Sequence, residues 1–305
     1  MMNVLLTGAT GYIGSRLATE CIRLGDDTHV IVRQGSDRRR LPEALGPNDV
    51  HLYDGSLESL VRALQASKPD VVVHLASLFT VQHKQEQVVP LFESNILFGA
   101  LLLEAMVASG VEGFVNAGSF WQHFDSEDYN PANLYAATKK AFNDILKYYV
   151  EATALRAITL ELPDTFGPDD PRRKVTNLII DHLQRNTPLE LTAGDQVLDL
   201  VHVDDVVNAF VSAMRKVMHM ETKSAAYALS SGCPMKLKDL VGLAESISGK
   251  NSCLKLGAKE YRFREVMTTW EGGKPMPNWH PSRTIESFLS EQLRGRSSES
   301  SLRDN

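Results

Sequence analysis

Residues 4–24 read VLLTGATGYIGSRLATECIRL, and their pattern changes at three glycines, Gly8, Gly11 and Gly14. Before the glycines, residues 4–7 are apolar and β-rich, as in a buried strand. After them, residues 13–24 repeat apolar side chains at helical spacing. The stretch therefore predicts a strand that turns tightly into a helix.

The glycine loop supplies what a phosphate-binding turn needs. Glycines allow a tight turn, a close approach of backbone to a pyrophosphate, and close packing of helix on strand. The helix that follows presents free N–H groups and the positive end of its dipole. The spacing is GxxGxxG rather than GxGxxG, and its place between strand and helix favours a dinucleotide site over a merely structural turn. The expected site residues are Gly8, Thr10, Gly11, Tyr12, Ile13 and Gly14.

Strand and helix patterns alternate through the first half of the chain. The expected strands are residues 4–7, 29–33, 50–53, 71–75, 113–116 and 157–161. The helical patterns between them are residues 13–24, 56–66, 88–109 and 131–153. Several strands are apolar throughout, as parallel strands covered on both faces are. The alternation predicts an α/β fold with a Rossmann-like, doubly wound parallel sheet and right-handed crossovers.

The pattern changes after Leu162, where prolines and glycines mark a long loop. A helix is expected over about 174–185, short β-rich pieces over 188–203, a helix near 204–218 and a strand near 226–229. We expect a dinucleotide-binding domain over 1–165, which residues 197–235 rejoin. Residues 166–196 and 236–290 are expected to form a smaller C-terminal substrate-binding lobe, and residues 291–305 a disordered tail.

The bulk composition is that of an ordinary globular protein, with 43% hydrophobic and 23% charged residues among 305. A formal net charge of −6 gives no reason to expect a nucleic-acid or anionic-membrane partner. We find no run of about 18 apolar residues to span a bilayer and no signal-peptide pattern. Cys21, Cys233 and Cys253 have no metal-ligand spacing, so no metal is expected, and they suit a reducing cytoplasm.

The end of the second expected strand bears on cofactor choice. An acidic residue there would bind the adenosine ribose and favour NAD. This strand instead ends at Arg33, and Arg38, Arg39 and Arg40 follow. A guanidinium suits the 2′-phosphate of NADP, so we predict NADP(H), with contacts from Arg33 and Arg38, over NAD(H). For Arg39 and Arg40 the sequence favours a solvated loop.

Tyr135 and Lys139 are spaced i, i+4 in a helical pattern, which places them on one face. A phenol has a pKa near 10, and a neighbouring ammonium is expected to lower it toward the working range. Lys139 can also reach a ribose hydroxyl. Ser119 follows the fifth expected strand, so it is expected at the carboxyl edge of the sheet, where ligands bind. The three residues are candidates for proton transfer to a carbonyl oxygen.

TGATGYIG, HLAS at residues 74–77, Ser119 and YAATK at 135–139 together resemble the extended short-chain dehydrogenase/reductase family over most of residues 1–290. That family contains nucleotide-sugar epimerases, dehydratases and reductases. The resemblance implies that Asp54 contacts the adenine and that Asn95 supports the active-site backbone. A capping carboxylate and a helix-surface amide are the alternatives for these two. It also implies further cofactor contacts from Leu75, Ala76, Ser77, Tyr135, Lys139 and Pro163.

The residues after Ser119 restrict the types of reaction that this chain can catalyse. Dehydratases of the family carry an acidic pair there, and this chain has Phe120 and Trp121, which cannot transfer protons. Epimerases that enolise a ketone need an extra base, for which the sequence offers His123 or His202, although His202 reads better as a core or capping residue. Direct hydride transfer at one carbon remains.

Residues 116–123, 130–135, 262–267 and 278–281 resemble the 4-ketoreductases of deoxysugar biosynthesis, including CDP-abequose and CDP-paratose synthases of lipopolysaccharide O-antigen. The resemblance implies NADPH-dependent reduction of the C4 ketone of a CDP- or dTDP-linked 4-keto-6-deoxy or 3,6-dideoxy sugar, with Tyr135 as general acid. It also implies a homodimer joined through the helices at 88–109 and 131–153. The expected substrate contacts are Phe120, Trp121, Gln122, Asp164, Arg172, Arg173 and Arg264, and for each of the three arginines plain surface solvation is the alternative.

Three other interpretations stay open at this point. One is a nucleotide-sugar 4-epimerase with tightly held NAD. Another is a dinucleotide-binding sensor or scaffold without catalysis, although such a protein needs no complete Ser, Tyr and Lys set. The third is a reductase of carbonyl compounds that carry no nucleotide.

Overall fold

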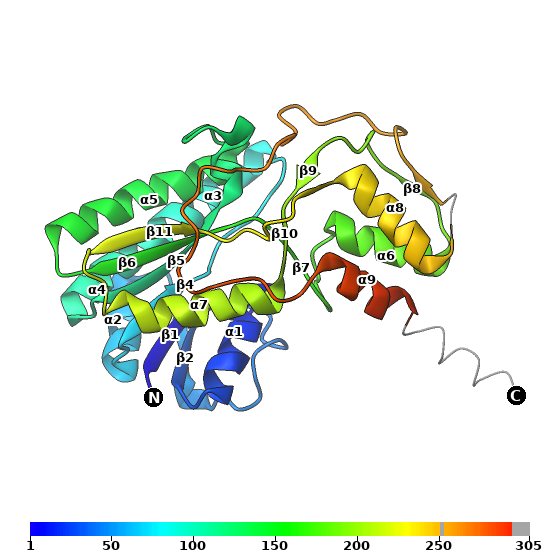
Figure 1. Ribbon diagram of the computed structural model, residues 1–305. Coiled ribbons are helices and arrows are strands. Elements are labelled where there is room, and N and C mark those ends of the chain that lie inside the picture. Colours follow the sequence, from blue (N-terminus) through cyan, green and yellow to red (C-terminus); the bar gives the residue numbers. More distant parts are fainter. Residues whose placement is uncertain (251–252, 295–305) are drawn as a thin grey trace, which may run out of the picture.

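A computed structural model describes residues 1–250 and 253–294 of the chain. Its centre is a seven-stranded, all-parallel sheet in the order β11-β6-β5-β4-β1-β2-β3 (Figure 1). The strands are β1 (Asn3–Thr7), β2 (Asp27–Arg33), β3 (Val50–Tyr53), β4 (Val71–His74), β5 (Gly113–Ser119), β6 (Arg156–Leu162) and β11 (Ser224–Ala228). The chain adds strands outward from β1 on one side and from β4 on the other, so the order reverses between these two. The predicted doubly wound fold is confirmed, and ligands bind such sheets at this reversal.

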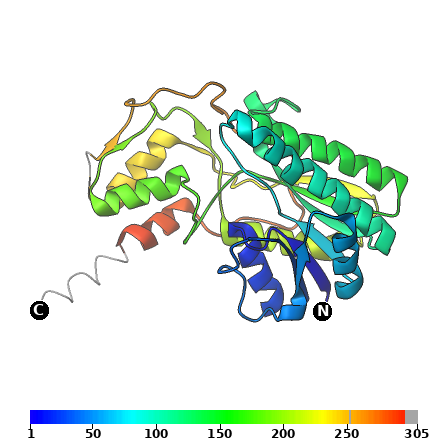
Figure 2. The same ribbon diagram turned by 180° about the vertical axis from the view of Figure 1, so that it is seen from behind.

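Helices cover both faces of the sheet. The helices α1 (Tyr12–Arg23) and α7 (Val203–Val217) pack on one face and share a core with it. The helices α2 (Leu57–Ser67), α4 (Phe98–Ser109) and α5 (Leu134–Ala152) pack on the other face, and α4 and α5 run along it in Figure 2. Each apolar strand therefore buries side chains on both sides, as its sequence indicated.

The expected helix at 88–109 is continuous but not uniform. It comprises α3 (Val88–Phe92), a π-helical segment η3 (Glu93–Leu97) and α4. By length and composition the stretch Gln85–Ser109 is apolar enough to cross a membrane, a property that core helices share. Leu102, Leu103 and Met106 lie fully buried in the core of the sheet, which accounts for part of this apolarity. The short 3-10 turns elsewhere are η1 (Pro47–Asp49), η2 (Gln85–Gln87), η4 (Phe120–Gln122) and η5 (Phe124–Ser126).

Later segments build a third apolar core beside the sheet (Figure 1). Its helices are α6 (Val175–Arg185), α8 (Leu237–Ser248) and α9 (Ile285–Arg294). Two-residue strands pair around them: β8 (Leu189–Glu190) with β13 (Leu254–Lys255), and β9 (Val197–Leu198) with β12 (Met235–Lys236). A further pair, β7 (Asp164–Phe166) with β10 (Leu200–His202), follows the end of β6.

The sequence predicts that the disordered tail begins at residue 291, which is too early. Residues 291–294 belong to α9, because Leu289 and Leu293 pack on the third core and keep the helix regular to Arg294. The remainder of that tail, residues 295–305, lies outside the described residues.

Candidate active site

The glycine loop is built by close packing at the sheet reversal. Gly8 has φ +73°, and a Cβ on it would stand 2.6 Å from the backbone nitrogen of Ala76, just beyond β4. A Cβ on Gly14 would collide with the carbonyl of Gly8. The N-cap of α1 is Gly11, which offers no side-chain cap, so the first N–H groups of α1 face the loop without one. The loop therefore requires glycine at both positions and leaves an anion-binding helix end open.

The segment after β4 is tied to this loop. The backbone N–H groups of Leu75 and Ala76 donate to the carbonyl and the hydroxyl of Thr7, at 3.3 and 3.2 Å. Thr7 Oγ1 also pairs with His74 Nδ1 at 2.9 Å. Burial and the charge of Lys139 lower the pKa of His74 to about 3. These contacts bring Leu75 and Ala76 beside the glycine loop, and the cofactor contacts that the resemblance implies for residues 75–77 stay a prediction.

Asn95 fixes the next residues of this segment. Its Oδ1 accepts from the N–H of Leu78 at 2.7 Å and from the hydroxyl of Ser77 at 3.1 Å. Its Nδ2 donates to the carbonyl of Leu78 at 3.1 Å and to Thr138 Oγ1 at 2.9 Å. Asn95 is 1% exposed, so the alternative of a helix-surface amide is excluded. It supports the backbone of residues 77–78 and links it to α5.

The structure brings Ser119, Tyr135 and Ser77 together. Ser119 is the last residue of β5, and its Oγ accepts the N–H of Trp121 at 3.2 Å. Tyr135 lies in the first turn of α5, which Asn133 caps by accepting from the N–H of Ala136. The hydroxyls of Ser77 and Ser119 both hydrogen-bond the Tyr135 phenol, and both bonds lower its pKa. A strand end and a helix start thus present hydroxyl groups to one point.

The expected lowering of the phenol pKa is wrong for this structure. Burial raises the pKa of Tyr135 to about 12, against smaller opposing effects of Ser77, Ser119 and the charge of Arg172. Burial also lowers the pKa of Lys139 to about 8. Burial disfavours both charged forms, because desolvation is the largest cause of each shift. At neutral pH Tyr135 is therefore a protonated phenol, and Lys139 is mostly an ammonium.

Two residues that the sequence did not single out lie beside Tyr135. The ring of Phe79 lies 5.1 Å from that of Tyr135 at 79°, and 5.4 Å from that of Trp121. Lys174 Nζ lies 4.8 Å over Phe79 and 5.4 Å over Trp121, and it donates to Asp164 Oδ1 at 2.7 Å. The only signal in the sequence was the position of Phe79, two residues after the end of HLAS. An aromatic wall with a held ammonium therefore borders the phenol.

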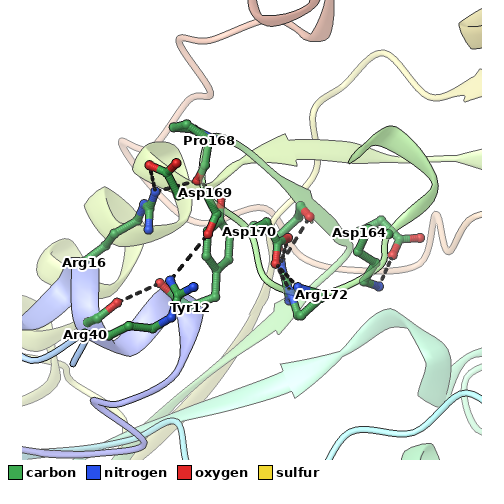
Figure 3. A network of polar contacts seen from close by, with 11 residues as sticks. Tyr12, Arg16, Arg40, Asp164, Pro168, Asp169, Asp170 and Arg172 are labelled. Atoms are coloured by element: carbon green, nitrogen blue, oxygen red, sulfur yellow. Dashed lines mark hydrogen bonds and ion pairs between the residues drawn. The ribbon is translucent and has the colours of Figure 1, made fainter. Parts of the chain in front are cut away.

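Figure 3 shows a polar network between the glycine loop and the loop after β7. The Tyr12 ring lies between the guanidinium groups of Arg16 and Arg172, at 4.5 and 4.8 Å. The Tyr12 hydroxyl and Arg16 Nη2 both donate to the Pro168 carbonyl, at 3.1 and 2.6 Å. Asp170 holds Arg172 through two hydrogen bonds of 2.8 and 2.7 Å. The expected substrate residue Arg172 is thus anchored beside the start of α1, and its charge reaches Tyr135.

Two expected substrate residues make contacts within the protein. Gln122 is 1% exposed, and its amide bonds the Ser119 carbonyl and Asn143. Arg264 stacks on Phe124 at 4.1 Å, and its Nη2 donates to Asn130 and Pro131. The prediction for Gln122 is corrected, because its buried amide bonds groups of the folded chain, whereas the substrate contact of the half-buried Arg264 stays a prediction.

Phe120 also differs from the expectation. It packs edge-on against Trp270 at 5.4 Å and lines a cavity of about 810 Å³ together with residues of 228–234 and 269–281. Neither Ser119 nor Tyr135 lines that cavity. Of residues 120–122, Trp121 is the one that packs against Phe79 beside Tyr135.

The remaining basic candidates differ in their surroundings. Arg173 and Arg262 are both exposed, and Arg262, which the sequence did not single out, lies near Asp164. The hydrogen bonds that the Arg262 guanidinium donates to the Glu265 carboxylate raise the pKa of Arg262, and the charge of Asp164 adds to this. Lys174 and Arg262 thus both carry positive charge next to Asp164.

The residues expected at the adenosine end lie on the surface. Arg33 ends β2, and Arg38 lies in the following loop, both exposed. Arg39 pairs with Asp37 at 2.7 Å, and Arg40 donates to the Asp169 carbonyl at 3.4 Å. Arg33 and Arg38 form none of the ion pairs found among residues 1–250 and 253–294.

Asp54 and Pro163 occupy the other edges of the site. The Asp54 carboxylate accepts from the N–H and hydroxyl of Ser56, at 2.9 and 2.5 Å, which lowers its pKa to about 2. The N-cap of α2 is Ser56, so Asp54 bonds the capping residue and Arg62 rather than capping the helix itself, and its predicted adenine contact stays a prediction. Pro163 follows Leu162, which pairs with Ser119 in the sheet, so it lies at the same sheet edge as Ser119.

Neither candidate base for an enolising epimerase is free. His123 Nε2 pairs with Glu161 Oε2 at 2.7 Å, its Nδ1 pairs with the Glu127 carbonyl, and its ring stacks on Trp270 at 3.7 Å. His202 is buried, and its Nδ1 accepts from the N–H of Asp204 at the start of α7. His202 is a capping histidine, as its sequence indicated.

Comparison with known proteins agrees with this geometry. The chain is 26% identical to a CDP-abequose synthase of Salmonella typhimurium over 298 residues, which cover 94% of this chain and 97% of that one. It is 28% identical to a CDP-abequose synthase of Yersinia pseudotuberculosis, over 87% of this chain and 91% of that one. The structure of MoeE5 in complex with UDP-glucose and NAD matches with a TM-score of 0.79 and 26% identity, over 97% of this chain and 99% of that one. The model of the NAD dependent epimerase/dehydratase family matches residues 4–226, and the chain belongs to this family.

Proposed function

We propose that this protein is a nucleotide-sugar 4-ketoreductase that uses NADPH. Its substrate is a CDP- or dTDP-linked 4-keto-6-deoxy or 3,6-dideoxy sugar, which places it in deoxysugar biosynthesis. The observation that carries the proposal is the meeting of Ser119 and protonated Tyr135 beside the glycine loop. The likeness to CDP-abequose synthases over nearly the whole chain supports it.

The residues present fit a dinucleotide. Gly8 and Gly14 keep the turn tight, since a Cβ at either would collide with backbone, and the uncapped start of α1 suits a pyrophosphate. Leu75, Ala76 and Ser77 would line its nicotinamide half, and the Lys139 ammonium would bind the ribose hydroxyls. When bound, the reduced nicotinamide supplies the hydride.

The protein's own part is proton transfer and electrostatic placement. Tyr135 donates its proton to the carbonyl oxygen as negative charge develops there, because its raised pKa keeps the phenol protonated. Ser119 Oγ already accepts from Trp121, so its hydroxyl proton is free to bond the same oxygen. The Lys139 ammonium then stabilises the phenolate that proton donation leaves behind.

The surroundings of Tyr135 support a deoxygenated sugar. The ring faces of Phe79 and Trp121 suit a methyl or methylene group, because a hydroxyl buried against them loses its hydrogen bonds. Lys174, Arg262 and Arg172 supply positive charge near this wall, which suits a substrate diphosphate.

Cofactor preference gives a first prediction. We expect kcat/KM with NADPH to exceed that with NADH by about 10- to 100-fold, because one or two charged hydrogen bonds to the 2′-phosphate are worth that much. Steady-state rates with both cofactors measure it. Arg33→Ala should erase the preference, and Arg39→Ala, which removes an arginine held by Asp37, should not. A preference of the wild type for NADH would contradict the assignment.

Removal of the Ser119 hydroxyl gives a second prediction. Ser119→Ala should lower kcat about 100-fold or more, as loss of one donor to a developing oxyanion does. The KM for NADPH should stay near its wild-type value, since the hydroxyl serves the ketone. Ser126→Ala, in the nearby turn η5, is the matched control. Equal rates for Ser119→Ala and wild type would remove Ser119 from the reaction.

The function itself is tested by a substrate screen. NADPH oxidation is followed with nucleotide-linked 4-keto-6-deoxy sugars, with and without the 3-hydroxyl and with CDP or dTDP. Stoichiometric oxidation with one of them supports the proposal. A protein purified with bound NAD that interconverts 4-epimers without net NADPH consumption is an epimerase, and one that binds cofactor but turns over nothing is a sensor.

We also propose a cytoplasmic homodimer. Val89, Phe92 and Leu97 on α3 to α4 are between 46 and 63% exposed, and Tyr148 on α5 is 66% exposed. Contiguous exposed apolar side chains of this kind mark interfaces, and the two helices are those the resemblance implicated. Light scattering of the purified protein measures the oligomeric state.

A further inference from the structure

A chain of side-chain amides runs from the sheet to Ser119. Asn116 Nδ2 on β5 donates to Asn143 Oδ1 at 2.8 Å. Asn143 Nδ2 donates to Gln122 Oε1 at 3.2 Å, and Gln122 Nε2 donates to the Ser119 carbonyl at 3.0 Å. Asn116 is fully buried and Gln122 is 1% exposed. Buried amides of this kind are costly unless paired, so the chain is a specific feature of the fold.

The position of Asn143 connects this chain to the catalytic helix. Tyr135, Lys139 and Asn143 are spaced i, i+4 and i+8 on α5, so they share one face. Asn143 is thus the next residue along the face that carries the phenol and the ammonium. Through Gln122 it reaches the backbone of Ser119, which comes from β5.

The Ser119 carbonyl, at one end of the chain of amides, fixes the direction of every hydrogen bond in that chain. The Ser119 carbonyl can only accept, so Gln122 must turn its NH₂ group toward it. Gln122 then presents its oxygen to Asn143, which must turn its own NH₂ group toward Gln122. Asn143 is left with its oxygen toward Asn116 Nδ2. An acidic residue of the same shape as Asn143 would break this order, because a carboxylate has no N–H to donate.

We infer that Asn143 and Gln122 are positioning residues that hold Ser119 against Tyr135. The inference rests on the proposed function, in which both hydroxyls bond the same ketone oxygen. Ser119 is the last residue of its strand and enters the 3-10 turn η4, so strand pairing ends where its hydroxyl is needed. The amide chain restrains Ser119 where strand pairing ends, and it connects Ser119 to α5, the helix that bears Tyr135. A misplacement of about 1 Å is enough to cost about 100-fold in rate.

The test uses Asn143→Asp, Gln122→Met and the double variant in the full-length protein. Each single change keeps the side-chain size and removes a donor. We expect each to lower kcat about 10- to 100-fold with the KM for NADPH unchanged. The double variant should lose no more than either single variant, because the two amides act as one unit. Asp144→Asn, whose carboxylate pairs with Lys140 on the exposed side of α5, is the matched control and should keep the wild-type rate.

Amide hydrogen exchange of residues 119–122 provides a readout that needs no substrate. Loss of the chain should speed exchange there while the melting temperature of Gln122→Met stays close to that of the wild type. Wild-type kcat in both single variants, or additive losses in the double variant, would overturn the inference. If the wild type reduces no 4-keto sugar, the proposed function fails by itself, and exchange then decides: faster exchange supports the positioning role and unchanged exchange rejects it.

Discussion

Replacement of Tyr135 by phenylalanine is expected to abolish turnover while NADPH still binds. The variant keeps the ring that packs against Phe79 and loses only the hydroxyl that Ser77 and Ser119 surround. Without the phenol, the hydroxyl of Ser119 would have to donate the proton to the ketone oxygen, and it is too weak an acid to do so. General acids contribute up to about 10⁴-fold in rate, so we expect a loss of at least about 10³-fold. Single-turnover rates and NADPH fluorescence titration measure the two effects separately.

The matched control for this variant is on the same helix. Tyr149→Phe removes a hydroxyl that donates to Glu104 at 2.7 Å on the exposed side of α5. It should leave kcat unchanged. If Tyr135→Phe retained turnover, the general acid would be another group, and the proposed mechanism would be wrong.

Replacement of Lys139 by methionine is expected to inactivate the enzyme and to stabilise the cofactor-free protein. Lys139 is 3% exposed, and burial lowers its pKa from 10.5 to about 8. Holding the ammonium in this place at pH 7 therefore costs about 3 kcal/mol, which an apolar side chain of similar length does not incur. The fold keeps a destabilising charge where the reaction needs one, as active sites often do.

The pH dependence of unfolding checks the sign of this effect. The folded pKa lies below the unfolded value, so between about pH 8 and 10.5 the unfolded chain binds more protons. The wild type should therefore gain stability as pH rises through this window, and the penalty should be complete below about 8. Urea unfolding without cofactor, at several pH values, measures the free energy of unfolding. Lys140→Met, one residue along on the more exposed side, should show no such difference, and a Lys139→Met protein less stable than wild type at pH 7 would contradict the argument.

The sheet and the shared helix of Tyr135 and Lys139 could be predicted because each depends on local sequence. Apolar runs at 50–53 and 71–75 and the helical repeat after Gly14 match β3, β4 and α1 to within a residue or two. A strand that is buried on both faces has consecutive apolar residues, and a tight turn against a pyrophosphate requires glycine. The i, i+4 spacing of Tyr135 and Lys139 is likewise a property of one helix.

The parts that could not be predicted depend on contacts between distant segments. Phe79 and Lys174 meet only because the chain between them folds back, and no motif links them. The sequence predicts Gln122 in the sugar pocket because it lies soon after Ser119. In the structure, its amide oxygen instead accepts a hydrogen bond from Asn143 inside the protein. The pKa of Tyr135 was misjudged for the same reason, since the nearby charge was visible in the sequence and the burial was not.

The edge position of β11 has a consequence for synthesis. Within the seven-stranded sheet β11 has β6 as its neighbour, and all of α6 and α7 are translated between the two strands. While the ribosome adds these residues, β6 presents unpaired backbone groups along one edge, and such an edge can recruit strands from other nascent chains. A messenger truncated before codon 224 should therefore yield a product that retains every catalytic side chain and still precipitates.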